Sequence, residues 1–337
     1  MNVRKGVWSN MVKEMAKNIY RIEVPMPDNP LRILNSYFIR GEERDLLIDT
    51  GFQLPACREA LAAGLAELGS VQERRDILLT HLHSDHSGLA AEFVGEKGHI
   101  YMNAADLVYQ HGICDGNIYP RMHAQYLAEG YPPELVEEHE HNNPARQGAM
   151  KTVDPRFVAI HDGQRFHAGD YELTAIDVPG HTPGNTMFYI EKQKIMFTGD
   201  HILFDITPNI TAFVGIEDSL GKYLASLKKS AAYEVELALP GHRESGDYSK
   251  RIEELEAHHA SRIAEAEKLV IMEPGLTAYE ITGQMKWKIH SRDWASFPNH
   301  QKWFAVGECL AHLDYLRLRG HIVREQDEKG IWHYFQS

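Results

Sequence analysis

Residues 81–86, with the sequence HLHSDH, contain three His and one Asp, which are residue types that commonly bind metal ions in proteins. The segment follows a short apolar run, so an extended backbone is expected to lead into it. Alternate residues of an extended segment point to one side, and His81 and His83 could therefore bind one cation. Asp85 and His86, just past the bend, could turn toward a second. A solvated polar turn before a helix is the simpler interpretation, but three His and one Asp within six residues favour metal binding.

Three later positions add potential ligands: His181 in PGHTPG, Asp200 in TGD and His242 in PGH. The Gly and Pro residues around them form tight turns that can hold a side chain at the rim of a sheet. Each of these patterns is weak by itself. In this order behind HLHSDH, they complete two sets of three ligands and one carboxylate able to bridge the sets.

The segments that must position these residues are predicted to be strands and helices of an α/β protein. Strands are expected as two runs within residues 31–49 and at 77–80, 157–160, 171–178, 186–190 and 194–198. Helices are expected at 55–68 and 87–93. A strand that ends in the ligand motif and is followed by a helix exposes side chains at the carboxyl end of a sheet, where α/β proteins place their sites.

Taken together, IDTG, THLHSDH, PGHTPG, TGDH and PGH resemble the motifs of the metallo-β-lactamase-fold hydrolase superfamily over residues of about 18–245. The resemblance implies an α/β (α+β) fold, a four-layer αββα sandwich with metals at one sheet edge. It implies that His81, His83 and His181 hold a first metal, that Asp85, His86 and His242 hold a second, and that Asp200 bridges them. Asp49 would support the ligand loop without contacting metal. The HTPG motif also resembles that of glyoxalase II.

The chain is expected to divide into a catalytic domain, residues 1–248, and a C-terminal domain, residues 249–337. Residues of about 104–150 interrupt the α/β alternation with helical, Tyr-bearing, acidic sequence, interpreted as a lid over the site. The sequence of the tail predicts a long helix from 249, helices at 277–285 and 301–319, and a hairpin. This order of elements is that of a winged-helix domain. It resembles the winged-helix-like domain of the superfamily branch that includes β-lactamase-like protein 2.

Composition favours a protein of the cytoplasm that acts on small molecules. The net charge of −13 discourages non-specific binding to nucleic acid or anionic lipid. No apolar run is long enough to span a membrane or to serve as a signal peptide, and three scattered Cys cannot form a disulfide framework. A homodimer is one possible role of the tail.

The predicted function is that of a dinuclear metal hydrolase in which a metal-bridging hydroxide attacks an ester-like bond. Two divalent ions are expected, Zn²⁺ first and Fe or Mn as alternatives. Asp85 could orient the hydroxide or take its proton, and His201 is a candidate proton donor to the leaving group. An acyl substrate (thioester, ester, lactone or lactam) suits the acidic lid.

Two alternatives to an acyl substrate remain open. The first is a phosphodiesterase or endoribonuclease, which would use a basic face of the tail formed by Lys286, Lys288, Arg292, Lys302, Arg317 and Arg319. The second, from another class of enzyme, is a mononuclear iron dioxygenase that oxidises sulfur, which would not need the second ligand set.

Overall fold

Two β-sheets form the centre of the computed structural model, which describes residues 11–142, 148–287 and 293–337. The first sheet has the order β1 (Val12–Ala16), β2 (Ile19–Pro25), β3 (Ile33–Ile39), β4 (Asp45–Ile48), β5 (Arg75–Leu78), β6 (Ile100–Asn103), β7 (Phe157–Ile160). The second has the order β12 (Leu237–Pro240), β11 (Ile195–Gly199), β10 (Thr186–Ile190), β9 (Tyr171–Asp177), β8 (Arg165–Ala168). The strands predicted from the sequence are all present, and β1, β2, β6, β8 and β12 are additional.

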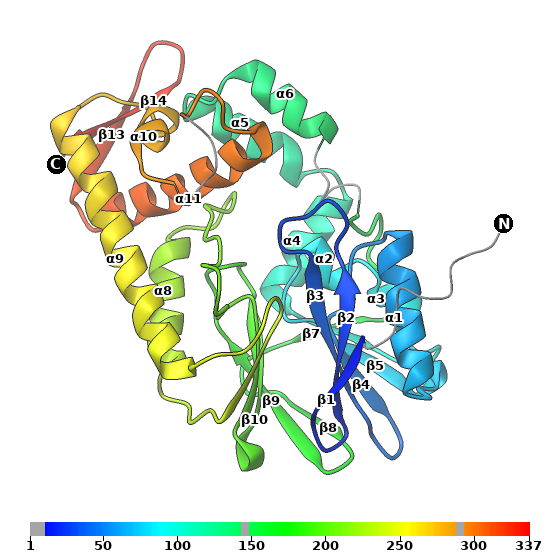
Figure 1. The fold of residues 1–337 in the computed structure, drawn as a ribbon. Helices are drawn as coiled ribbons and strands as arrows, with labels where there is room; N and C mark the ends of the chain where they lie inside the picture. Colours follow the sequence, from blue (N-terminus) through cyan, green and yellow to red (C-terminus); the bar gives the residue numbers. More distant parts are fainter. Residues whose placement is uncertain (1–10, 143–147, 288–292) are drawn as a thin grey trace.

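Helices cover the outer faces of both sheets, and this gives four layers (Figure 1). On the side of the first sheet lie α1 (Pro55–Glu67), α3 (Ala90–Phe93) and the turn η1 (Gln72–Arg74). On the side of the second lie α8 (Ser219–Ser230) and the start of α9 (Tyr248–Met272), while η2 (Glu191–Gln193) joins β10 to β11. The αββα expectation is confirmed.

The apolar core between the sheets holds the two layers in fixed relation. Ile39 and Leu78 of the first sheet belong to the same buried cluster as Phe188 and Phe197 of the second, and all four are fully excluded from solvent. Removing a buried Phe side chain costs about 3–5 kcal/mol, because the cavity cannot close. The loops at the ends of these strands therefore start from well-defined positions.

The helix expected at residues 87–93 is instead two single turns, α2 (Ser84–Ser87) and α3. The break falls at Leu89, whose N–H donates to the carbonyl of Gly51 and not to a helical partner. The first turn, α2, therefore begins inside the ligand motif, and its four residues include Asp85 and His86.

The insertion and the C-terminal segment form one further group, seen at one end of the sandwich in Figure 1. Its elements are α5 (Ile118–Ala128), α6 (Pro133–Asn142), α10 (Ala278–Gln284), α11 (Asn299–Leu318), β13 (Ile322–Gln326) and β14 (Trp332–Gln336). The first helix of the insertion, α4 (Ala104–Cys114), instead contacts β6 and β7 of the first sheet. The Trp303 indole lies between the Tyr126 and His139 rings, parallel to both, with centroid separations of 3.8 and 3.9 Å. The insertion is thus packed firmly against the tail.

The long helix α9 joins the two parts. Leu255, in its first half, packs in the core behind the second sheet, whereas Val270, near its end, packs in the core of the tail. The domain boundary predicted at residue 248 falls on the first turn of α9, and the two-domain division remains a prediction. In the described residues, no helix is both long enough and apolar enough to cross a bilayer.

Candidate metal centre

Four loops at one edge of the sandwich bring the predicted ligands together. The loop after β5 and the turn α2 carry residues 81–86, and the turn between β9 and β10 carries His181. Asp200 follows β11 directly, and His242 follows β12. All of these positions follow the end of a strand, with no other strand between, which explains why residues far apart in sequence converge.

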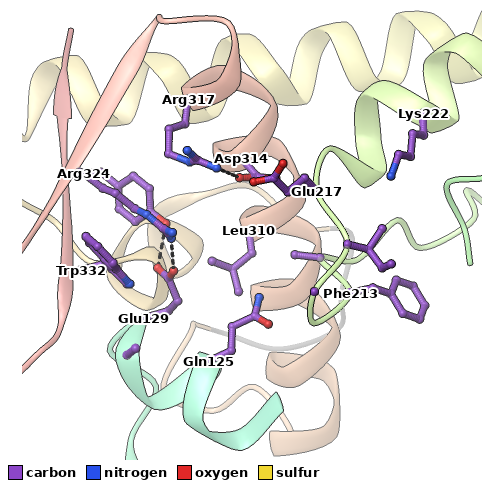
Figure 2. Close-up of a pocket in the computed structure, with 15 residues that line it drawn as sticks. Gln125, Glu129, Phe213, Glu217, Lys222, Leu310, Asp314, Arg317, Arg324 and Trp332 are labelled. Atoms are coloured by element: carbon purple, nitrogen blue, oxygen red, sulfur yellow. Dashed lines mark hydrogen bonds and ion pairs between the residues drawn. The ribbon is translucent and has the colours of Figure 1, made fainter. Parts of the chain in front are cut away.

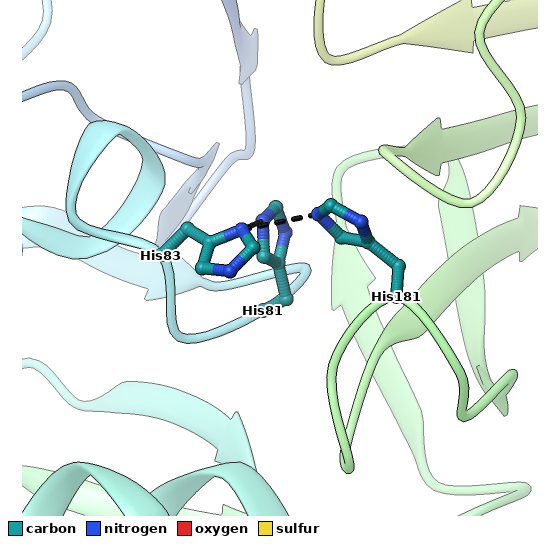
Figure 3. Close-up of side chains that lie close together, drawn as sticks. All are labelled: His81, His83 and His181. Atoms are coloured by element: carbon teal, nitrogen blue, oxygen red, sulfur yellow. Dashed lines mark hydrogen bonds between the residues drawn. The ribbon is translucent and has the colours of Figure 1, made fainter. Parts of the chain in front are cut away.

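Three imidazole nitrogens point at one another in the first group (Figure 3). His83 Nδ1 lies 2.9 Å from His81 Nε2 and 3.0 Å from His181 Nε2. Nitrogens about 2.0–2.1 Å from a tetrahedral cation would be slightly farther apart, near 3.3 Å. The three side chains therefore offer one face of a cation-binding site and need only a small adjustment to accept an ion.

A second group forms beside the first. His86 Nε2 lies 3.3 Å from His242 Nε2, and Asp85 Oδ2 lies 3.3 Å from His242 Nε2 and 3.8 Å from His86 Nε2. The ligand atoms of this group, like those of the first, all lie within 4.8 Å of one another. The two groups correspond to the two sets predicted from the sequence.

Asp200 lies between the groups. Its Oδ2 is 3.8 Å from His181 Nε2 and 3.5 Å from His242 Nε2, and its Oδ1 is 3.5 Å from His86 Nε2. Among the residues that the structure describes, Oδ1 is buried and has no hydrogen-bond partner, which is costly for a carboxylate oxygen. An orphaned oxygen facing converging imidazole nitrogens fits the requirements of divalent cations.

Hydrogen bonds on the far side of the rings fix their orientation. His181 Nδ1 donates to the carbonyl of Asn209, and His242 Nδ1 donates to the carbonyl of Ile33, each at 2.8 Å. His86 Nδ1 lies 2.7 Å from Asp49 Oδ2. A proton held on the outer nitrogen leaves the lone pair of the inner nitrogen free for a cation.

Asp49 connects the ligand loop to the end of β4. Besides His86, it accepts hydrogen bonds from the Thr80 backbone N–H at 2.9 Å and from the Thr80 hydroxyl at 2.7 Å. Its backbone is left-handed, with φ of 59°, a conformation that costs free energy outside glycine. The three hydrogen bonds hold the carboxylate there, in agreement with the supporting role predicted from the motif IDTG.

Burial and neighbouring charges set the protonation of the cluster. Burial holds the pKa of His81 well below its usual range and lowers that of His83 to about 3, so both rings are neutral and can bind a cation. Burial opposes ionisation of Asp85, yet His86 and His242 lower its pKa to about 2. Burial also opposes a charge on His86, but Asp49 and Asp200 raise its pKa well above the usual value. A bound cation would displace this proton.

The glycine before His242 is required by the crowding of the cluster. A Cβ atom at Gly241 would lie 2.5 Å from Asp200 Oδ1 and 2.8 Å from His86 Cε1. Any side chain there would push ligand atoms apart. The PGH pattern, which is weak as a sequence signal, thus has a specific steric reason.

Asp106, in the first turn of α4, is a residue of this site that the sequence did not reveal. One oxygen accepts hydrogen bonds from the Leu82 N–H at 2.8 Å and the Thr182 hydroxyl at 2.7 Å, and the other accepts from the Gly184 N–H at 2.6 Å. The carboxyl is fully buried, and burial raises its pKa to about 7. Asp106 therefore ties the loop of His83 to the loop of His181.

His201 is not part of this group. Its side chain is fully buried, Nε2 lies 2.9 Å from the hydroxyl of Ser230 in α8, and the ring packs on Tyr223. Burial lowers its pKa to about 3. The assignment of His201 as a proton donor remains a prediction, and its surroundings favour a role in packing.

The basic face considered for nucleic acid is largely neutralised where the structure describes it. Arg317 pairs with Asp314 at 2.6 Å, Arg319 pairs with Asp218 at 3.0 Å, and Lys302 is buried. Lys286 is exposed, and Lys288 and Arg292 lie outside the described residues. Paired or buried cations contribute little to phosphate binding, so Lys302, Arg317 and Arg319 give no support to the RNA alternative.

The fold and the paired His/Asp groups define the class of protein. The family model described as the metallo-beta-lactamase superfamily matches residues 30–242, and the model of the metallo-beta-lactamase-like C-terminal domain matches residues 295–337. The chain belongs to the metallo-beta-lactamase superfamily, and it is a hydrolase.

The proteins similar to this chain include two that are named thioesterases. Human acyl-coenzyme A thioesterase MBLAC2 is 28% identical over 214 residues, which are 62% of this chain and 72% of that protein. Lactamase-like protein adaB of Aspergillus niger is 28% identical over 250 residues, 73% of this chain and 59% of adaB. Atrochrysone carboxyl ACP thioesterase of Aspergillus fumigatus is 27% identical over 177 residues, 52% of this chain and 31% of that enzyme.

Solved structures match nearly the whole chain. A metallo-beta-lactamase family protein from Thermus thermophilus superposes with a TM-score of 0.81 and 28% identity, over 96% of this chain and all of that one. A beta-lactamase domain protein from Burkholderia ambifaria gives 0.82 at 23% identity, over 97% of this chain and 94% of that one, which supports the fold alone. Both matches extend through the insertion and the tail.

Proposed function

We propose that this chain is a metal-dependent thioesterase that hydrolyses small acyl thioesters at a centre for two divalent cations. The observation that carries the proposal is the pair of converging ligand groups with the buried, unpartnered Asp200 Oδ1 between them. The acyl-coenzyme A and acyl-carrier thioesterases among its relatives support the choice of bond.

The proposal assigns three side chains to each cation and shares a seventh between them. His81, His83 and His181 hold the first cation, Asp85, His86 and His242 hold the second, and Asp200 is shared. Imidazole and carboxylate ligands suit Zn²⁺, with Fe or Mn as alternatives. Bound cations would lower the pKa of water to about neutral and polarise the thioester carbonyl.

The chain's own groups orient the reactants and handle the proton. Asp85 is the more exposed carboxylate of the centre, with 14% of its side chain accessible against 8% for Asp200, and it is positioned to accept a proton from the attacking water. The water oxygen adds to the carbonyl carbon as Asp85 takes its proton, the C–S bond breaks, and that proton passes to the departing sulfur, so the products are a carboxylic acid and a thiol. Asp85 is the proposed base in this step.

The leaving group also favours a thioester. A thiol has a pKa of about 8.5, so a thiolate can depart near neutral pH without a strong proton donor. Amide nitrogen and alkoxide leaving groups depend much more on such a donor. The burial of His201 away from the ligand cluster is therefore compatible with thioester hydrolysis.

The test compares substrates on one preparation of known metal content. We expect metal-dependent turnover of a short acyl-coenzyme A and of the same acyl group on N-acetylcysteamine, lost in His81→Ala. A generic phosphodiester and single-stranded RNA serve as the competing substrates. Turnover of either one that is sensitive to His81→Ala, without thioester hydrolysis, would overturn the proposal. Dioxygen consumption with a persulfide by a preparation containing one iron would favour the dioxygenase alternative.

A further inference from the structure

A cavity of about 650 Å³ lies apart from the metal ligands, between α5, the segment of residues 212–217, α11 and the hairpin β13–β14 (Figure 2). This volume lies within the range of small-molecule sites. Its wall combines apolar side chains with converging charged groups. The lining residues used below are Glu129, Ala212, Glu217, Lys222, Arg317, Arg324 and Trp332.

A short stretch of chain connects this cavity to the metal centre. The Asn209 carbonyl accepts the 2.8 Å hydrogen bond from His181 Nδ1, and Ala212, three residues later, lines the cavity. Three residues span at most about 11 Å. The Ala212 N–H also donates to the carbonyl of Gly307 in α11, which fixes this stretch on the tail. The cavity therefore lies close to the residue that orients His181.

The charged groups of the cavity differ in how far they are already neutralised. Arg324 donates to Glu129 at 2.8 Å, and Arg317 donates to Asp314 at 2.6 Å. Within the described part of the chain, the exposed side chains of Lys222 and Glu217 make no hydrogen bond or ion pair. Lys222 thus has capacity left for an anionic ligand, whereas Glu129 and Asp314 neutralise the two arginines and Glu217 opposes an anion.

Trp332 offers an aromatic surface beside these cations. The Arg324 guanidinium carbon lies 4.2 Å from the centre of its ring, and the indole is half-buried at the end of the hairpin. An adjoining groove of about 410 Å³ is also lined by Arg317, Arg324 and Trp332. A half-buried indole in a cavity that also holds the Lys222 cation matches a ligand that carries both phosphates and an aromatic base.

We propose that this cavity binds the phosphorylated nucleotide end of a coenzyme A thioester, while its pantetheine arm leads to the metal centre. The inference rests on the proposed thioesterase function and names its substrate class. It favours coenzyme A over an acyl-carrier protein, because the carrier's phosphopantetheine has a single phosphate and no base. Lys222 would bind phosphate, and Trp332 would contact the base.

Two exposed residues with opposite charges provide the test. Lys222→Gln removes a cation and should raise the KM for acyl-coenzyme A about tenfold, since a charge-assisted hydrogen bond to phosphate is lost. Glu217→Gln removes the opposing carboxylate and should lower the same KM severalfold. Lys228→Gln is the matched control, because Lys228 is also an exposed lysine of α8 but lies outside the cavity lining.

Direct binding separates this inference from the proposed function. Calorimetry with 3′-phosphoadenosine 5′-diphosphate, which has no thioester, should give a binding signal that Lys222→Gln weakens and Lys228→Gln leaves intact. Equal KM shifts in Lys222→Gln and Lys228→Gln, or no nucleotide binding by an enzyme that hydrolyses both thioesters, would overturn the cavity assignment. Efficient hydrolysis of acyl-carrier substrates with none of acyl-coenzyme A would overturn it as well. Nucleotide binding without any thioester turnover would instead refute the proposed function.

Discussion

Asp106 provides a sharp test of how the fold positions the metal centre. It accepts three hydrogen bonds, from the Leu82 and Gly184 N–H groups and the Thr182 hydroxyl, inside a fully buried environment. In Asp106→Asn, one oxygen becomes an NH₂ group that faces at least one of these donors. Each buried donor left without an acceptor costs about 1–3 kcal/mol.

The magnitude follows from counting the donors. Asp106→Ala leaves all three donors unsatisfied, which costs about 3–9 kcal/mol of unfolding free energy. Part of this cost is offset, because burial makes the ionised carboxyl unfavourable and raises its pKa to about 7. Asp106→Asn leaves one or two donors unsatisfied, so we expect a loss of about 1–6 kcal/mol of unfolding free energy. His83 and His181 adjoin the bonded residues, and metal affinity should fall about 10–100-fold, as for other groups that orient ligands.

The assay measures metal dissociation constants by competition with a chromogenic chelator and thermal stability with and without metal. Asp115→Asn, an exposed aspartate at the other end of α4, is the matched control. If Asp106→Asn binds metal as tightly as the wild type and melts at the same temperature, the two ligand loops do not depend on Asp106 and the reasoning is refuted.

Three further predictions can be tested with the same protein. Asp200→Ala should reduce the metal content and abolish turnover; full activity with two bound metals would contradict its shared role. Burial raises the pKa of Glu129 to about 7, above the value of about 4.5 expected in the unfolded chain, so its contribution to stability is complete below pH 4.5 and is lost as the pH rises through 7. Glu129→Gln should remove this pH dependence, at most about 3 kcal/mol, in melts between pH 4.5 and 8, and an unchanged profile would argue against it. Trp303→Leu should cost about 3 kcal/mol or more, because the indole is stacked on both faces, and a smaller loss in denaturant titration would show that the stack contributes little.

The ligands could be predicted from the sequence because their signals are local. A dense His/Asp motif after an apolar strand, and Gly and Pro around His181 and His242, fix side chains at strand ends, where sheet geometry brings them together. Asp106 was missed because its bonding partners, Leu82 and Gly184, are 24 and 78 residues away. No local pattern distinguishes it from the other acidic residues of the insertion.

The extra strands and the cavity escaped prediction for related reasons. The strand β8, with the sequence RFHA, has two buried positions and two exposed ones, too few for a clear alternation. The cavity combines side chains from α5, α8, α11 and the hairpin, whose proximity depends on packing between distant segments. The insertion was expected to act as a lid, but its packing against Trp303 depends on partners that no sequence window contains.

The Trp303 stack has a practical consequence for protein engineering. Residues 1–248 look like a minimal enzyme in the sequence, because every candidate ligand precedes residue 248. A chain cut there would lose Trp303 and leave Tyr126, Tyr131 and Val136 of the insertion facing water, since all three pack in the apolar cluster of the tail. An exposed aromatic patch of this kind promotes aggregation. Shortening the enzyme would therefore require redesign of the insertion helices or their removal together with the tail.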